Sequence, residues 1–119
     1  MSDERLGENS DTSEGPLPGV AGRVADEQPE LWAAFQALGA PSAPGGPLDD
    51  PSRRLVGLAL AIGAGSEGAT HSHARRGLAE GLNAEQLDHV AFLAVTTLGW
   101  PQAMRGLSWI RDITRGPEE

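Results

Sequence analysis

The stretch from Gly65 to Gly81, GSEGATHSHARRGLAEG, decides how the rest of the chain is interpreted. It holds two of the three histidines and lies between two strongly apolar segments with helical spacing. A buried helix normally carries large apolar side chains on its inner face. This one carries small residues instead, at positions 68, 69, 70, 72, 74 and 77. The stretch therefore predicts a close approach of neighbouring helices or a small cavity, and any chemistry is expected here.

The composition excludes several classes of function. The 119 residues are enough for one domain, and the absence of cysteine excludes disulfides and thiolate chemistry. The net charge is −8, of which residues 1–28 contribute −5. An acidic chain without a basic stripe is a poor partner for nucleic acids and anionic membranes. The N-terminus is polar and the apolar run at 55–64 is too short to cross a bilayer, so we expect a cytoplasmic protein.

The hydrophobic pattern predicts an all-α domain of about five helices over residues 27–116, behind an acidic flexible tail at 1–26. The first helix is expected at 27–38 and is followed by a linker rich in proline and glycine at 40–48. Asp50 is expected to cap the second helix, Ser66 the third, and Asn83 with Gln86 the fourth. Pro101 opens the fifth helix. A domain this small with an apolar second helix would expose much hydrophobic surface as a monomer, so we expect an oligomer.

From Arg53 to Ile113, the order of these features resembles the carboxymuconolactone decarboxylase family, which includes the alkyl hydroperoxidase D-like proteins. The resemblance lies in the segments RRLV at 53–56, the histidine-bearing stretch at 65–78, GLNAEQL at 81–87 and TLGWPQAM at 97–104. It covers about half of the chain. It implies an all-helical fold, assembly into homotrimers or homohexamers, and a pocket near the helix that carries the histidines.

The chain departs from the peroxidase members of that family at three positions. Those members carry Cys-x-x-Cys, a histidine four residues later and a glutamate on the preceding helix. In this sequence the cysteine positions hold Ser66 and Ala69, the glutamate position holds Arg54, and only His73 is retained. Dithiol peroxide reduction needs a thiolate nucleophile and a resolving thiol, so this activity is excluded. The decarboxylase branch lacks the cysteine pair and keeps the histidine, and this chain is closer to it.

The histidine-bearing helix supplies the candidate catalytic residues. His73 is a candidate general acid or base because imidazole titrates near neutral pH, and the enolate-like carbon left by decarboxylation must be reprotonated. The alternative is a structural histidine bonded to a backbone carbonyl or water. His71 points about 200° away from His73 on a helix, so the two cannot chelate one metal. Glu67 and His71 share a face and could orient each other, form an ion pair, or supply two ligands to a metal completed across a subunit interface. We expect no metal and no cofactor, because zinc sites need three or four converging ligands.

Candidate substrate-binding residues lie on this helix and on either side of it. Arginine binds carboxylates through two parallel hydrogen bonds, which makes Arg53, Arg54 and Arg76 candidates for holding a carboxylated substrate. Salt bridges between subunits, to Glu67, Glu80 or Asp112, are the structural alternative. Trp100 is a candidate wall of an apolar pocket, or else packs in the core or an oligomer interface.

Together these features favour a decarboxylase-like enzyme that acts on a small carboxylated or lactone substrate by general acid–base chemistry. The alternative is a non-catalytic ligand-binding or assembly protein on the same scaffold, since both cysteines and the relay glutamate are missing.

Overall fold

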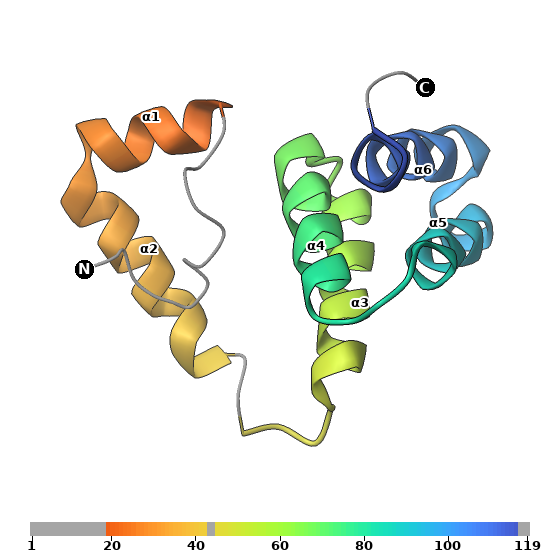
Figure 1. The fold of residues 1–119 in the computed structure, drawn as a ribbon, viewed down its shortest axis with the longest axis horizontal. Coiled ribbons are helices and arrows are strands. Elements are labelled where there is room, and N and C mark those ends of the chain that lie inside the picture. The colour runs from red at the N-terminus through yellow and green to blue at the C-terminus, as the bar shows by residue number, and fades with distance from the viewer. Residues whose placement is uncertain (1–18, 43–44, 117–119) are drawn as a thin grey trace. The chain divides into compact units, whose positions relative to one another are not determined.

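The computed structural model describes residues 19–42 and 45–116 and is all-helical there, which confirms the predicted fold class (Figure 1). Six helices follow one another: α1 (Gly19–Glu27), α2 (Pro29–Ser42), α3 (Asp50–Gly63), α4 (Glu67–Ala79), α5 (Ala84–Leu98) and α6 (Trp100–Thr114). The chain divides into two compact units, one ending at Pro47 and the other beginning at Leu48. The candidate site residues all lie in the second unit, which contains α3 to α6.

The first unit differs in detail from the expected tail and first helix. α1 covers Gly19–Glu27, so the end of the segment expected as a flexible tail is helical, while residues 1–18 lie outside the described residues. α2 begins at Pro29 and continues past the expected end at Leu38, through Pro41, to Ser42. The division into a tail at 1–26 and a domain at 27–116 stays a prediction.

The helix starts of the second unit follow capping chemistry. The first cap lies one residue earlier than predicted: Asp49, not Asp50, accepts a hydrogen bond from the Ser52 amide at 2.9 Å. A cap side chain reaches the amide three residues on, and from Asp49 that amide is available, whereas Asp50 is already helical. Ser66 caps α4, accepting from the Ala69 amide at 3.1 Å, as predicted.

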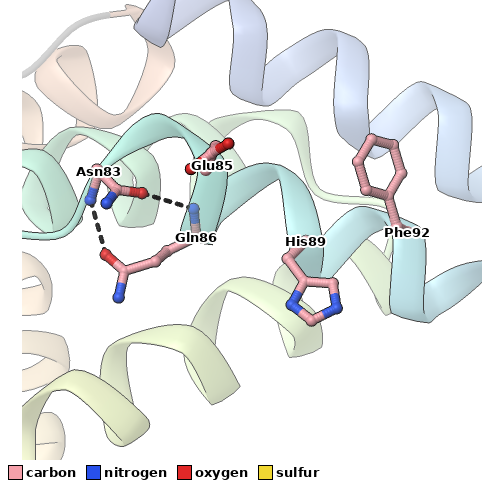
Figure 2. A pocket seen from close by; sticks show the side chains of 5 residues that line it. All are labelled: Asn83, Glu85, Gln86, His89 and Phe92. Carbon is pink, nitrogen blue, oxygen red and sulfur yellow. Dashed lines mark hydrogen bonds between the residues drawn. The ribbon is translucent and has the colours of Figure 1, made fainter.

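The start of α5 forms the predicted capping box (Figure 2). The Gln86 amide donates to Asn83 Oδ1 at 2.8 Å, and the Asn83 amide donates to Gln86 Oε1 at 2.9 Å. Two amides that have no partner within the helix are thereby satisfied. The cap fixes where α5 begins and therefore which of its residues face α3 and α6.

The core of the second unit is formed by large aliphatic side chains from α3, α5 and α6 around small residues of α4. The fully buried large side chains include Leu58, Ile62, Leu87 and Ile110. Each contributes about 1.5–3 kcal/mol relative to exposure. On α4 the buried residues are Thr70, Ala74 and Gly77.

The small residues of α4 bring helices together. A Cβ at Gly77 would lie 3.2 Å from Leu87 Cδ2 and 3.3 Å from Leu82 Cδ1. The small residues predicted either close packing of helices or a small cavity. At Gly77 the structure shows close packing. The helices of the described residues are not long and apolar enough for any of them to cross a membrane.

Candidate functional site

His73 projects from α4 toward α3 and lies over a glycine of that helix. A Cβ at Gly57 would lie 2.7 Å from His73 Cε1 and 3.1 Å from His73 Nδ1, closer than packed atoms tolerate. The imidazole therefore occupies the space that a side chain at position 57 would fill. His73 is partly buried.

Arg54, one turn before Gly57 on α3, fixes the protonation of this imidazole. Its Nη1 lies 2.7 Å from His73 Nδ1. Because a guanidinium has donors only, Nδ1 must accept and carries no proton. The neutral ring therefore holds its proton on Nε2. The contact also brings together the two positions that the family's peroxidase pattern assigns to its relay glutamate and histidine.

Glu80, immediately after α4, holds Arg54 in place. Arg54 Nε donates to Glu80 Oε1 at 2.9 Å and Arg54 Nη2 donates to Oε2 at 2.8 Å, so the pair is bidentate. The hydrogen bonds from Arg54, aided by the charges of Arg54 and Arg76, lower the pKa of Glu80 below its ordinary value. Salt bridges between subunits were the structural alternative for the arginines, and Arg54 instead pairs with Glu80 of its own chain.

Sequence analysis did not assign Gly57 and Glu80 to the site. Glu80 follows His73 by seven residues, or two helical turns, and that spacing was a usable signal for a shared face. Gly57 gave no such signal, because one glycine inside an apolar helix predicts nothing about its neighbour across the contact. Its role becomes visible only when α3 and α4 are placed together.

The other predicted substrate-binding residues are dispersed. Arg53 donates to the Leu48 carbonyl at 2.7 Å and pairs with Asp50 within α3. Arg76 lies close enough to Glu80 for its charge to lower the pKa of that carboxyl. Trp100 opens α6 and is 64% exposed.

Glu67 and His71 lie on the side of α4 that faces α6, away from His73. His71 Nε2 is 3.0 Å from Asp112 Oδ2, on α6. One ligand atom each of Glu67, His71 and Asp112 lies within 4.8 Å of the other two. The structure therefore places Glu67 and His71, two of the predicted catalytic candidates, in a second cluster with Asp112. The sequence did not indicate Asp112 as their partner.

An apolar groove of about 890 Å³ runs between α3 and α5. It is lined by Val56, Ala59 and Leu60 of α3 and by Val90, Leu93 and Ala94 of α5. His89 also lines it and projects from α5 near Phe92 (Figure 2). Arg54 and Gly57, by contrast, are the α3 residues that contact His73, so the groove and the His73 site use different faces of α3.

Comparisons with known proteins identify the family and the fold. The model of the carboxymuconolactone decarboxylase family matches residues 29–112, from α2 to near the end of α6. The chain therefore belongs to the carboxymuconolactone decarboxylase family.

Two relatives show how far the similarity extends. An uncharacterized protein from Haemophilus influenzae is 38% identical over 53 residues, which are 44% of this chain and 47% of that protein. The chain thus matches about half of that relative's length. The crystal structure of a carboxymuconolactone decarboxylase family protein from Legionella pneumophila is similar with a TM-score of 0.67 and 23% identity. The similarity covers 79% of this chain and 84% of the Legionella chain, and at this identity it shows the fold alone.

Proposed function

We propose that this protein is an enzyme of the carboxymuconolactone decarboxylase type, which acts on a small carboxylated or lactone substrate with His73 as the hydrogen-bond donor to the negative charge that develops in the reaction. Family membership supports the class of reaction. The observation that carries the residue assignment is the 2.7 Å contact between Arg54 Nη1 and His73 Nδ1. It leaves a neutral imidazole whose proton is on Nε2, so that nitrogen is a hydrogen-bond donor.

The proposed step is a decarboxylation followed by reprotonation. The bond between the carboxylate and the ring carbon that carries it breaks, CO₂ leaves, and the electron pair moves through the ring double bond into the lactone carbonyl as an enolate. His73 Nε2–H donates a hydrogen bond to this developing negative charge, and the carbon then takes up a proton from solvent. The positive charge of Arg54 at Nδ1 makes Nε2–H a stronger hydrogen-bond donor.

A positive charge close to His73 supports a carboxylated substrate. Arg54 and Arg76 both place positive charge near Glu80. Arg76, Arg53 and Trp100 remain predictions for substrate binding. Glu67 and His71 lie on the α6 side of α4 and have no part in the proposed step.

A second candidate function rests on the same contacts. A guanidinium engaged on three of its nitrogens by Glu80 and His73 also serves as a rigid connection between α3 and α4. On this reading, the protein keeps the family scaffold for ligand binding or assembly and has no turnover. The two candidates differ in whether replacing His73 changes a rate or only the stability.

The test is decarboxylation of 4-carboxymuconolactone, followed by ultraviolet absorbance, for the wild type and His73→Gln. Glutamine keeps a polar side chain of similar length but lacks a ring N–H that is polarised by a hydrogen bond from Arg54. The control is His89→Gln, which makes the same change at an exposed histidine of α5. We expect turnover to fall at least about a hundredfold in His73→Gln and to be unchanged in His89→Gln.

The outcomes separate the proposals. Turnover that survives His73→Gln contradicts the assignment of His73. If wild type shows no turnover while His73→Gln lowers the melting temperature, the non-catalytic role is supported instead.

A further inference from the structure

A cluster of three metal-ligand residues lies between α4 and α6, on the opposite side of α4 from His73. Glu67 and His71 are one helical turn apart on α4, and Asp112 faces them from α6. Their ligand atoms all lie within 4.8 Å of one another. We propose that Glu67, His71 and Asp112 bind a divalent cation of the zinc type, which joins α4 to α6.

The ligand set fits such an ion in kind and charge. One imidazole nitrogen and two carboxylate oxygens are ordinary zinc ligands, and three protein ligands leave a position for water. With His71 neutral, the two carboxylates give the cluster a charge of −2, equal and opposite to that of the cation. Imidazole with carboxylates and no thiolate favours Zn²⁺ over Cu⁺, and over Mn²⁺ by the general affinity order of divalent metals.

The geometry requires only side-chain movement. Tetrahedral bonds of 2.0–2.1 Å would place ligand atoms roughly 3.3 Å apart. His71 Nε2 and Asp112 Oδ2 are already 3.0 Å apart. Glu67 is exposed at the start of α4, so rotation about its own bonds can bring its carboxylate the remaining distance.

Metal binding would move one proton from one ring nitrogen of His71 to the other. In the metal-free arrangement His71 Nε2–H donates to Asp112, because a carboxylate only accepts. A metal ligand must present a lone pair, so the proton of His71 moves from Nε2 to Nδ1. His71 Nε2 and Asp112 Oδ2 can then both bind the cation. The existing hydrogen bond therefore holds two of the three ligands near their binding positions.

The expectation of no metal depended on sequence spacing alone. Glu67 and His71 supply two ligands from one helix face, and Asp112 follows His71 by 41 residues. No local pattern marks Asp112 as their partner, because it becomes one only when α6 packs on α4. The third ligand thus comes from the same chain and not from a second subunit.

The test is titration of Zn²⁺ into the chelator-treated full chain by calorimetry, with metal content determined by elemental analysis. We expect one saturable Zn²⁺ per chain and a melting temperature that rises with zinc. His71→Gln, Asp112→Asn and Glu67→Gln should each weaken binding at least about tenfold, since even outer partners of metal ligands are worth about 10–100-fold. His89→Gln is the matched control and should bind as wild type.

Glu67→Gln keeps the contact between His71 and Asp112, so its loss of affinity cannot come from a disturbed helix pair. Circular dichroism checks that each variant is folded. The proposal is overturned if zinc binds only weakly at many sites, or if binding is the same in wild type, His71→Gln and Asp112→Asn. Because His73 lies on the other side of α4, this result is independent of the decarboxylation assay.

Discussion

By the resemblance to peroxidase members of the family, Arg54 occupies the position of their glutamate, and this exchange would reverse the hydrogen bond to His73. A carboxylate at this position accepts, which would put a proton on Nδ1 and leave Nε2 as a base. The guanidinium of Arg54 donates to Nδ1, so Nδ1 carries no proton and Nε2 is the hydrogen-bond donor of the ring. One substitution on α3 therefore turns Nε2 from a hydrogen-bond acceptor into a hydrogen-bond donor. This fits the proposed reaction, in which negative charge develops on an enolate oxygen.

The ion pair between Arg54 and Glu80 should make stability depend on pH. The folded-state pKa of Glu80 lies below its ordinary value of 4.5 because of the hydrogen bonds from Arg54. A lowered pKa stabilises the fold fully above that value, and the stabilisation is lost as the pH falls through the folded-state pKa. We expect Glu80→Gln to lower the free energy of unfolding by about 1 kcal/mol or less at pH 7, since Glu80 is half exposed. Urea unfolding at several pH values measures this difference, which should shrink toward zero in acid.

Arg54→Gln supplies the control for this prediction. In that background Glu80→Gln should have no pH-dependent effect, because Arg54→Gln has already removed the ion pair. An equal effect of Glu80→Gln with and without Arg54 would mean that the pair does not stabilise the fold.

At the scale of the helices, the site depends on how closely α4 approaches its neighbours. Gly57 admits the imidazole to the surface of α3, and Gly77 admits Leu82 and Leu87 to α4. A similar contact occurs between α3 and α6, where a Cβ at Gly106 would lie 2.7 Å from Ile62 Cγ2. Small residues at these crossings set the separation of the helices that carry His73 and Arg54.

Gly57→Ala tests this packing. The added methyl would lie 2.7 Å from His73 Cε1, and overpacking costs about 1–3 kcal/mol, more than the roughly 0.5–1 kcal/mol gained by replacing a helical glycine. We therefore expect net destabilisation in urea unfolding. Gly68→Ala is the control: no atom lies within 4 Å of a Cβ there, so it should be neutral or slightly stabilising. Equal effects of the two changes would refute the close contact.

Sequence reasoning succeeded for elements and fell short for contacts between them. Ser66, and Asn83 with Gln86, were found because a cap is a relation between residues three positions apart. The cap of α3 was one residue off because Asp49 and Asp50 both satisfy the pattern. α1 was missed because the acidic composition of residues 1–26 indicated a flexible tail, although α1 carries Val20 and Val24. Gly57 and Asp112 were beyond reach, because their partners are set by the packing of helices distant in sequence.

At the scale of the whole molecule, the groove between α3 and α5 leaves large apolar side chains exposed. Leu60 is 69% exposed and Leu93 is 63% exposed. Val56 and Phe92 add further apolar surface from the same two helices. Contiguous patches of this kind mark interaction sites on soluble proteins. We propose that this face joins copies of the chain in the homotrimer or homohexamer that the sequence predicts.

Leu60→Gln should weaken that assembly. A polar side chain in the centre of an apolar interface loses buried area and leaves an amide without partners. We expect the molar mass measured by light scattering after size-exclusion chromatography to shift toward the monomer as the protein is diluted. Leu78→Gln makes the same change at an exposed leucine of α4 and should keep the wild-type mass. A monomeric wild type, or equal behaviour of the two variants, would rule out this interface.

The protonation of His73 is the point on which the proposed chemistry depends most directly. Long-range proton–nitrogen NMR spectra of the wild type near neutral pH distinguish protonated from unprotonated ring nitrogens, and His73→Gln identifies the signals. We predict that Nδ1 of His73 is unprotonated and Nε2 carries the proton, as the contact with Arg54 requires. A proton on Nδ1 would contradict the account, because Arg54 could then neither set the tautomer of His73 nor direct its remaining proton toward a substrate.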